Sequence, residues 1–290
     1  MCESLFSSTD LPIPMPSIDP TRSDVTPPYP PAWDADTDER LQAFLNRDLR
    51  GGVAAFDFDN TLVMGDAGEA VMLEVMARRG YHAEQMMRWY RELLHSAHTG
   101  SAYGYISRVF SGHQVAEFTE LSQTAFTRRG IVFHPAVVGL MATLQQRGVR
   151  CMIVSATNVW VVRTLVQVGL DPLLTSMGGR PLDLRDVHGM RLMMRDRGHW
   201  VRDEDLRDDD AYLRGDPIRT RSLVVTEVME EPACTYEGKG AVVRRYVGDD
   251  EHFVLAAGDS ANDEAMLSLA EFPLWVTHRL AHPGSDKVHG

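Results

Sequence analysis

The sequence has few cysteines and no excess of basic residues. These shortages argue against a disulfide-stabilised protein and against a nucleic-acid-binding protein. Its 290 residues include three cysteines, Cys2, Cys151 and Cys234, whose spacing matches no metal site and whose odd number argues against a disulfide framework. Acidic residues outnumber basic ones by 41 to 29, which gives a formal net charge of −12. The sequence contains no basic stripe that could displace counterions from phosphates, so we expect no nucleic-acid partner. We expect a soluble enzyme in a reducing, cytoplasmic setting.

Long apolar runs are also missing. No stretch is long enough to span a bilayer, and the N-terminus lacks the basic and continuously apolar regions of a secretion signal. We therefore expect no membrane association. Prolines, by contrast, gather in residues 1–32, with Ser, Thr and Asp between them. Because such a segment cannot form a regular helix or sheet, we expect an extended or disordered arm there.

The chain is organised around residues 53–62, where the apolar run Val-Ala-Ala-Phe precedes Asp57-Phe-Asp59-Asn-Thr61-Leu. A short apolar run that ends in polar residues predicts a buried parallel strand with reactive groups at its carboxyl end, where open α/β sheets bind ligands. Two neighbouring carboxylates repel each other unless a divalent cation lies between them, and their oxygens suit Mg²⁺. Taken alone, the Asp-x-Asp pattern is explained equally well by solvated aspartates at a strand end.

The rest of the chain alternates apolar strands with amphipathic helices. Further strands are expected at residues 150–156, 187–194, 223–228, 252–260 and 272–277, whereas residues 67–130 show helical spacing throughout. This alternation predicts an α/β fold, a Rossmann-like, doubly wound and mostly parallel sheet with an inserted all-helical cap domain. We expect the catalytic core at residues 33–66 and 131–290 and the cap at residues 67–130.

An acidic stretch runs from Asp203 to Asp210. It lacks the glycine and the ligand spacing of a calcium loop. We therefore expect a solvated surface loop.

Four short motifs carry polar groups in a fixed order: Asp-Phe-Asp-Asn-Thr, Val-Ser-Ala-Thr, Gly-Lys-Gly and Gly-Asp-Ser-Ala-Asn-Asp. The carboxyl ends of parallel strands share one edge of a sheet, so these groups can converge although about 200 residues separate them. With all four motifs in this order, the sequence resembles the haloacid dehalogenase-like phosphohydrolases over about residues 53–277.

The resemblance implies a role for each motif residue. Asp57 would be the nucleophile that forms an aspartyl-phosphate, and Asp59 would be the general acid and base. The phosphate-binding residues would be Thr61, Ser155, Ala156 and Lys239. Magnesium would be held by Asp57, by the main-chain carbonyl of Asp59, by Asp259, and by Asp263 directly or through water.

The implied function is Mg²⁺-dependent hydrolysis of a small phosphomonoester. Asp59 disfavours dehalogenases, which lack this aspartate, and transport ATPases, which have threonine there. Two alternatives remain open: a phosphotransferase that passes the phosphoryl group from Asp57 to an alcohol, and a catalytically silent binding module on the same fold. An intact Asp57 argues against the silent module.

The position of the expected cap resembles that of phosphoserine phosphatases and of bacterial phosphorylcholine phosphatases, which implies an amine- or choline-bearing substrate such as phosphocholine or phosphoserine. By position, Asp66 and Glu69 match a carboxylate that faces the substrate's ammonium group in these relatives. Both are equally explained as acids favoured at a helix N-terminus. Aromatic residues of the cap, such as Tyr90 and Tyr103, could surround a cation, although core packing explains them at least as well.

Overall fold

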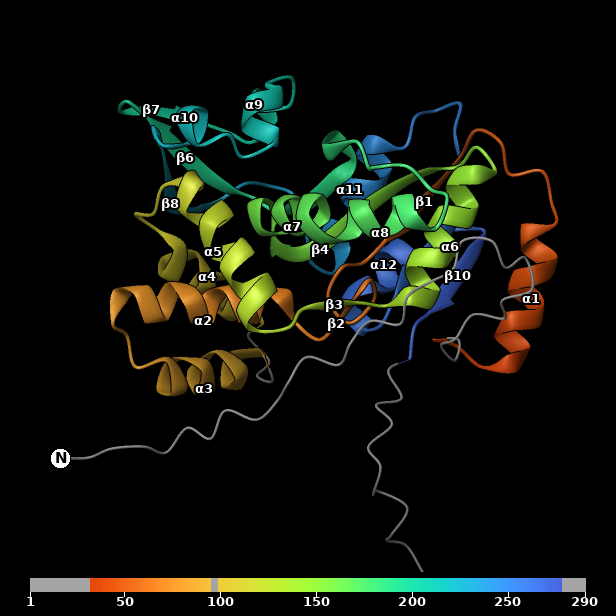
Figure 1. The fold of residues 1–290 in the computed structure, drawn as a ribbon, viewed down its shortest axis with the longest axis horizontal. Helices are drawn as coiled ribbons and strands as arrows, with labels where there is room; N and C mark the ends of the chain where they lie inside the picture. The colour runs from red at the N-terminus through yellow and green to blue at the C-terminus, as the bar shows by residue number, and fades with distance from the viewer. Residues whose placement is uncertain (1–31, 95–98, 278–290) are drawn as a thin grey trace, which may run out of the picture.

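The computed structural model describes residues 32–94 and 99–277. Its centre is a five-stranded sheet in the order β10-β9-β1-β4-β5, in which every neighbouring pair is parallel (Figure 1). The strands are β1 (Gly52–Phe56), β4 (Arg150–Asn158), β5 (Val187–Met190), β9 (His252–Gly258) and β10 (Phe272–Trp275). The α/β, mostly parallel fold predicted from the sequence is thereby confirmed.

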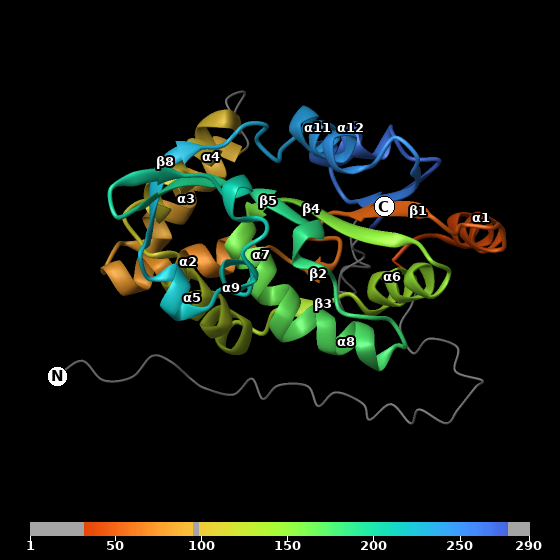
Figure 2. The same cartoon turned by 90° about the horizontal axis from the view of Figure 1, so that it is seen from above.

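Helices cover both faces of this sheet, and β1 is therefore buried on both sides. Val53 and Ala55 face the side packed by α11 and α12, whereas Ala54 and Phe56 join the larger core that includes α6 and α7. In Figure 2, α11 and α12 lie on one face and α6, α7 and α8 on the other. The bounds are α1 (Ala35–Leu45), α6 (Pro135–Gln146), α7 (Val159–Leu165), a π-helical turn (Val166–Leu170), α8 (Asp171–Ser176), α11 (Glu237–Tyr246) and α12 (Glu264–Leu267).

A group of four helices is inserted between β1 and β4. The chain leaves the core through β2 (Val63–Met64) and returns through β3 (Val132–Phe133), and these two short strands pair antiparallel. Between them lie α2 (Ala67–Arg79), α3 (Ala83–Leu94), α4 (Thr99–Phe110) and α5 (Val115–Arg128). Figure 1 shows this group at one end of the molecule and α1 at the other.

A second, antiparallel sheet of order β7-β6-β8 packs against the inserted helices. The domain boundaries predicted from the sequence did not include this sheet. The N–H of Gly112 donates to the carbonyl of Val225, and the N–H of Val225 donates to the carbonyl of His113, which ties β8 to the loop between α4 and α5. The elements are β6 (Leu192–Asp196), β7 (His199–Val201), α9 (Asp210–Leu213), α10 (Pro217–Thr220) and β8 (Leu223–Met229), with 3₁₀ turns at Leu184–Asp186, Glu204–Leu206 and Ala261–Asp263.

The strand-like stretch expected at residues 187–194 contains parts of two strands. The chain bends at Arg191, so that β5 belongs to the parallel sheet and β6 to the antiparallel one. The buried guanidinium of Arg191 pairs with Glu204 at 3.1 Å and donates to the hydroxyl of Tyr246 at 3.2 Å. An apolar run shows that both segments are buried but does not reveal this bend.

The solvated loop expected at residues 203–210 also needs correction at its start. Asp203 is 2% exposed and forms a bidentate ion pair with Arg163 of α7, with N–O distances of 2.6 and 3.1 Å. A local run of acidic residues does not show a partner forty positions earlier. Residues 1–31 of the expected proline-rich arm lie outside the residues that the structure describes. Among the described residues, no helix is long and apolar enough to cross a membrane.

Candidate active site

Asp57 follows β1 directly and lies at the carboxyl edge of the parallel sheet. Its N–H donates to the carbonyl of Ala257 in β9, which places the loop after β1 beside the loop after β9. The carboxylate is 5% exposed, and its Oδ1 accepts a hydrogen bond from Nζ of Lys239 at 2.6 Å. The structure therefore brings the first and third motifs together across 182 positions of sequence.

Lys239 is buried at the start of α11 and contacts two carboxylates. Its Nζ lies 2.6 Å from Oδ1 of Asp57 and 2.6 Å from Oδ1 of Asp263. Burial alone would lower the pKa of Lys239, but the two carboxylates outweigh burial and raise it. The chain reaches this position because Gly238 has no side chain: a Cβ there would lie 1.6 Å from the carbonyl oxygen of Ala233.

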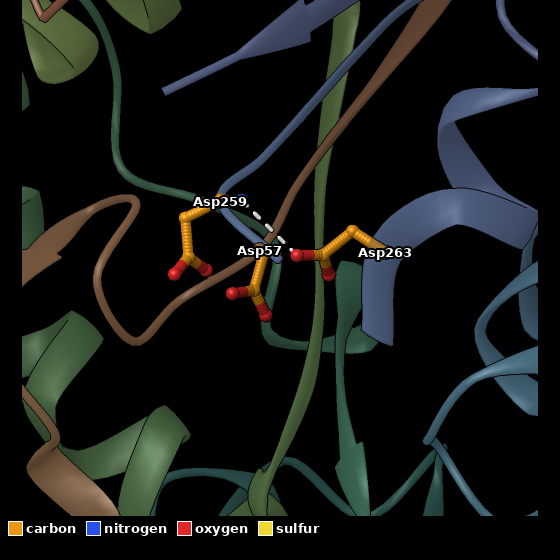
Figure 3. Close-up of side chains that lie close together, drawn as sticks. All are labelled: Asp57, Asp259 and Asp263. Carbon is orange, nitrogen blue, oxygen red and sulfur yellow. Dashed lines mark hydrogen bonds between the residues drawn. The ribbon is translucent and has the colours of Figure 1, made fainter. Parts of the chain in front are cut away.

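The carboxylates of Asp57, Asp259 and Asp263 form a cluster with at least one oxygen from each within 4.8 Å of the others (Figure 3). Burial raises the pKa of Asp57, and the charges of Asp263 and Asp59 add to this effect. Burial, together with Asp263, raises the pKa of Asp259 to about 6. Crowded carboxylates of this kind are stabilised by a divalent cation, and an all-oxygen donor set fits Mg²⁺.

Asp263 also holds the loop that carries Asp259. Its Oδ2 accepts hydrogen bonds from the main-chain N–H groups of Asp259 and Ser260, both at 3.1 Å, and from Oγ of Ser260 at 3.2 Å. Gly258 permits this approach, since a Cβ there would lie 2.5 Å from Cβ of Asp263. Both oxygens of Asp263 are thus engaged by the protein, which fits a supporting role or ligation through water better than sole use as a metal ligand.

Asp59 is held by both the core and the inserted helices. Its Oδ1 accepts the N–H of Ala67 at the start of α2, and its Oδ2 accepts the hydroxyl of Thr157 at the end of β4, both at 2.6 Å. Burial raises the pKa of Asp59, while the hydrogen bonds from Thr157 and Ala67 oppose the rise. A raised pKa favours the protonated form that a general acid requires.

The predicted phosphate-binding residues lie at different depths. A cavity of about 220 Å³ is lined by Asp57, Asp59 and Asp259 together with Ala156 and Thr157. Ser155 and Lys239 lie beneath this lining, both at most 1% exposed. Thr61 is fully buried and does not line the cavity, and its hydroxyl has no hydrogen-bond partner within the described ranges.

The structure separates Asp66 from Glu69. Asp66 is the N-cap of α2 and lines the cavity, whereas the Glu69 carboxylate turns away and pairs with Arg91 of α3 at 2.7 Å. The outer wall of the cavity comes from α3 and α4, with Tyr90 and Leu94 from the first and Tyr103, Ile106 and Phe110 from the second. No Lys, Arg or His is among the described residues that line it.

Thr157, Asn60 and Asn262 also line the cavity, although the resemblance implied no role for them. Each lies inside one of the four motifs, so position within the motif was the available signal. A larger hollow of about 860 Å³ lies between α5 and the α9–α10 region, and it contains none of the motif residues.

Comparisons with known proteins found one family model and several solved structures that are similar to this chain. Residues 54–192 match the sequence model of a family described as haloacid dehalogenase-like hydrolase. A conserved protein of unknown function from Anaerococcus prevotii is structurally similar, with a TM-score of 0.54 and 15% identity over 81% of this chain and 83% of that one. A HAD family hydrolase from Salmonella enterica serovar Typhi gives a TM-score of 0.50 and 14% identity over 81% of this chain and 66% of that one.

A phosphoserine phosphatase structure with a phospho-aspartyl intermediate analogue gives a TM-score of 0.45 and 15% identity, over 76% of this chain and 84% of that one. No curated protein matches the sequence. The two neighbours with the higher TM-scores support the same α/β fold that the strand order shows.

Proposed function

Because the chain belongs to the haloacid dehalogenase-like hydrolases, we propose that it is a Mg²⁺-dependent phosphatase that hydrolyses a small phosphomonoester through an aspartyl-phosphate. One observation carries the proposal: the buried Asp57 carboxylate contacts Lys239 and lies within a cluster with Asp259 and Asp263, while Asp59 lines the same cavity. The groups that this mechanism needs as nucleophile, neighbouring cation, metal ligands and acid therefore lie close together at one sheet edge, which supports the proposal.

In the first step, an oxygen of Asp57 attacks phosphorus and the ester P–O bond breaks. Asp59 gives its proton to the leaving oxygen, which departs as an alcohol. In the second step, water attacks the phosphorus of the aspartyl-phosphate, Asp59 accepts the water's proton, and the bond from phosphorus to Asp57 breaks to release phosphate. Lys239 offsets part of the negative charge gathered around Asp57 in both steps.

The residues that would hold Mg²⁺ are Asp57, Asp259 and the main-chain carbonyl of Asp59, with Asp263 supporting them. When bound, the cation supplies the positive charge that lets an anionic nucleophile approach a phosphate dianion. We further propose that residues 67–130 act as a cap over the core formed by residues 33–66 and 131–290. Support comes from the α3 and α4 side chains that wall the cavity.

Metal removal tests this proposal directly. We expect the purified protein to release phosphate from at least one member of a panel of phosphocholine, phosphoethanolamine, phosphoserine, sugar phosphates and nucleotides. Chelation with EDTA should lower the rate by at least about a hundredfold, since a catalytic metal contributes several kcal/mol, and added Mg²⁺ should restore it. Undiminished turnover after chelation, or no turnover of any ester, would contradict the proposal.

The cavity wall favours a cationic or neutral leaving group. Asp66 offers a carboxylate near aromatic Tyr90 and Tyr103, and the described lining has no basic side chain that could pair with an anionic leaving group. We therefore propose an amine- or choline-bearing ester as the substrate.

Replacing Asp66 by Asn removes its charge and keeps an N-cap for α2. We expect KM for phosphocholine or phosphoethanolamine to rise about tenfold, the effect of about 1.4 kcal/mol, with KM for a neutral ester such as glycerol phosphate nearly unchanged. Glu69→Gln should change KM much less, because Arg91 already holds the Glu69 carboxylate away from the cavity. Equal changes for cationic and neutral esters in Asp66→Asn would remove Asp66 from substrate recognition.

A further inference from the structure

Thr157, at the end of β4, makes the shortest side-chain contact of Asp59. Its Oγ1 lies 2.6 Å from Oδ2 of Asp59, whereas the hydroxyl of Ser155 lies 3.5 Å from the same oxygen. We propose that Thr157 is the positioning residue that aims the Asp59 carboxylate for proton transfer. The inference rests on the proposed phosphatase function, because it assumes the acid and base role of Asp59.

The Thr157 side chain is fixed by its surroundings. The residue is 9% exposed, and its N–H donates to Oγ of Ser155 at 3.0 Å. A Cβ on Gly68 would lie 2.5 Å from its hydroxyl, and a Cβ on Gly189 would lie 2.5 Å from its carbonyl oxygen. The start of α2 and strand β5 therefore both pack closely on Thr157. This packing limits the movement of the Thr157 hydroxyl away from Asp59.

The contacts of Asp59 distinguish its two oxygens. Oδ1 accepts a main-chain N–H from Ala67, which can only donate. Oδ2 accepts the Thr157 hydroxyl with one lone pair. The Ser155 hydroxyl, 3.5 Å away, makes only a weak contact with Oδ2, so the second lone pair can carry the exchanged proton. The geometry assigns proton transfer to Oδ2: the proton leaves Oδ2 for the ester oxygen as the P–O bond breaks, and the attacking water returns a proton to Oδ2.

A hydroxyl suits this role because it can donate to Oδ2 both when the carboxyl group is ionised and when the second lone pair of Oδ2 carries the exchanged proton. Asp59 must alternate between these two forms in a single turnover. Thr157 can therefore hold the carboxyl group in both halves of the reaction.

The test uses leaving groups of different acidity. Thr157→Val preserves the shape of the side chain and removes its hydroxyl. A primary alkyl ester such as phosphoethanolamine needs a proton on its leaving oxygen, whereas p-nitrophenyl phosphate needs little help. We expect kcat/KM, which reports the steps up to departure of the leaving group, to fall about 10- to 100-fold for the alkyl ester and less than about threefold for the aryl ester.

Three controls sharpen this test. Thr157→Ser keeps the hydroxyl and should restore most of the alkyl-ester rate. In an Asp59→Asn background, Thr157→Val should cause no further loss, because its effect acts through Asp59. Thr164→Val is the matched control, since this 3% exposed threonine of α7 donates only to the carbonyl of Trp160 among the described contacts. Its kinetics should equal those of the wild type.

Two results would overturn the assignment. Equal losses on both esters would show a general structural effect. A loss in Thr157→Val no larger than in Thr164→Val would show that the Thr157 hydroxyl plays no part in proton transfer. If the wild-type protein released phosphate from neither p-nitrophenyl phosphate nor any ester of the panel, the proposed function itself would fail, and this inference would fail with it. Urea unfolding of each variant separates lost folding from lost proton transfer.

Discussion

Replacing Asp57 by Asn is expected to abolish phosphate release, lowering kcat by at least about a thousandfold, because an amide cannot serve as the nucleophile that the carboxylate provides. The measurement is phosphate release with saturating Mg²⁺ and the best ester of the panel. Asp36→Asn, an exposed aspartate of α1, is the matched control and should retain full activity.

The Asp57→Asn protein is expected to remain folded. Lys239 keeps its 2.6 Å contact with Asp263, and the amide oxygen of Asn can still accept a hydrogen bond from it. Removing one charge from a group of crowded carboxylates also relieves repulsion, so the thermal midpoint should not fall. Activity of more than a few per cent in this variant would identify a different nucleophile. Lost activity with lost folding would leave the assignment without support.

The sheet and the gathering of its polar groups could be predicted from the sequence for one physical reason. Each strand of the parallel sheet is a short apolar run, and each motif follows directly after a strand or opens a helix. Parallel strands end at one edge, so local patterns alone placed Asp57, Ser155 and Asp259 near one another. The structure brings these residues together, while their chemical roles stay predictions.

The contacts that tune the site could not be predicted in this way. Glu69 turns from the cavity because Arg91 becomes its neighbour only after α2 and α3 have packed. The hydroxyl of Thr157 meets Asp59 across 98 positions of sequence. The second sheet was missed because β6 continues the apolar run of β5 with only Arg191 between them. Such features depend on long-range packing, which composition and periodicity do not encode.

A buried ion pair outside the active site carries the largest expected effect on stability. Arg163 of α7 and Asp203 are 4% and 2% exposed and form a bidentate pair. Asp203 also accepts the hydroxyl of Tyr212 at 2.6 Å, and that hydroxyl accepts the indole N–H of Trp160 at 2.7 Å. The network links α7, the 203–206 turn and α9, and so connects the core to the segment that packs on the inserted helices.

Arg163→Met is expected to lower the free energy of unfolding by about 3–5 kcal/mol at pH 7, because it leaves Asp203 buried without its cation. Urea unfolding measures the change. Arg47→Met is the control: Arg47 and its partner Glu271 have side chains 55% and 41% exposed, and losing such a pair should cost less than about 1 kcal/mol. The double variant Arg163→Met, Asp203→Leu should regain much of the loss, since neither charge then remains unpaired.

The pH dependence of this effect follows from the pKa of Asp203. Burial alone would raise the pKa, but Arg163 and the Tyr212 hydroxyl outweigh burial and hold it below its usual range. A lowered folded-state pKa stabilises the protein above the unfolded value of about 4, and this contribution is lost as pH falls through the folded value. In Arg163→Met the unpaired carboxyl can instead take up a proton, which relieves its cost. The difference in unfolding free energy between wild type and Arg163→Met should therefore shrink as pH is lowered from 7 towards 4 and below. A difference that stays constant over this range would show that the variant is destabilised by lost packing rather than by an uncompensated charge.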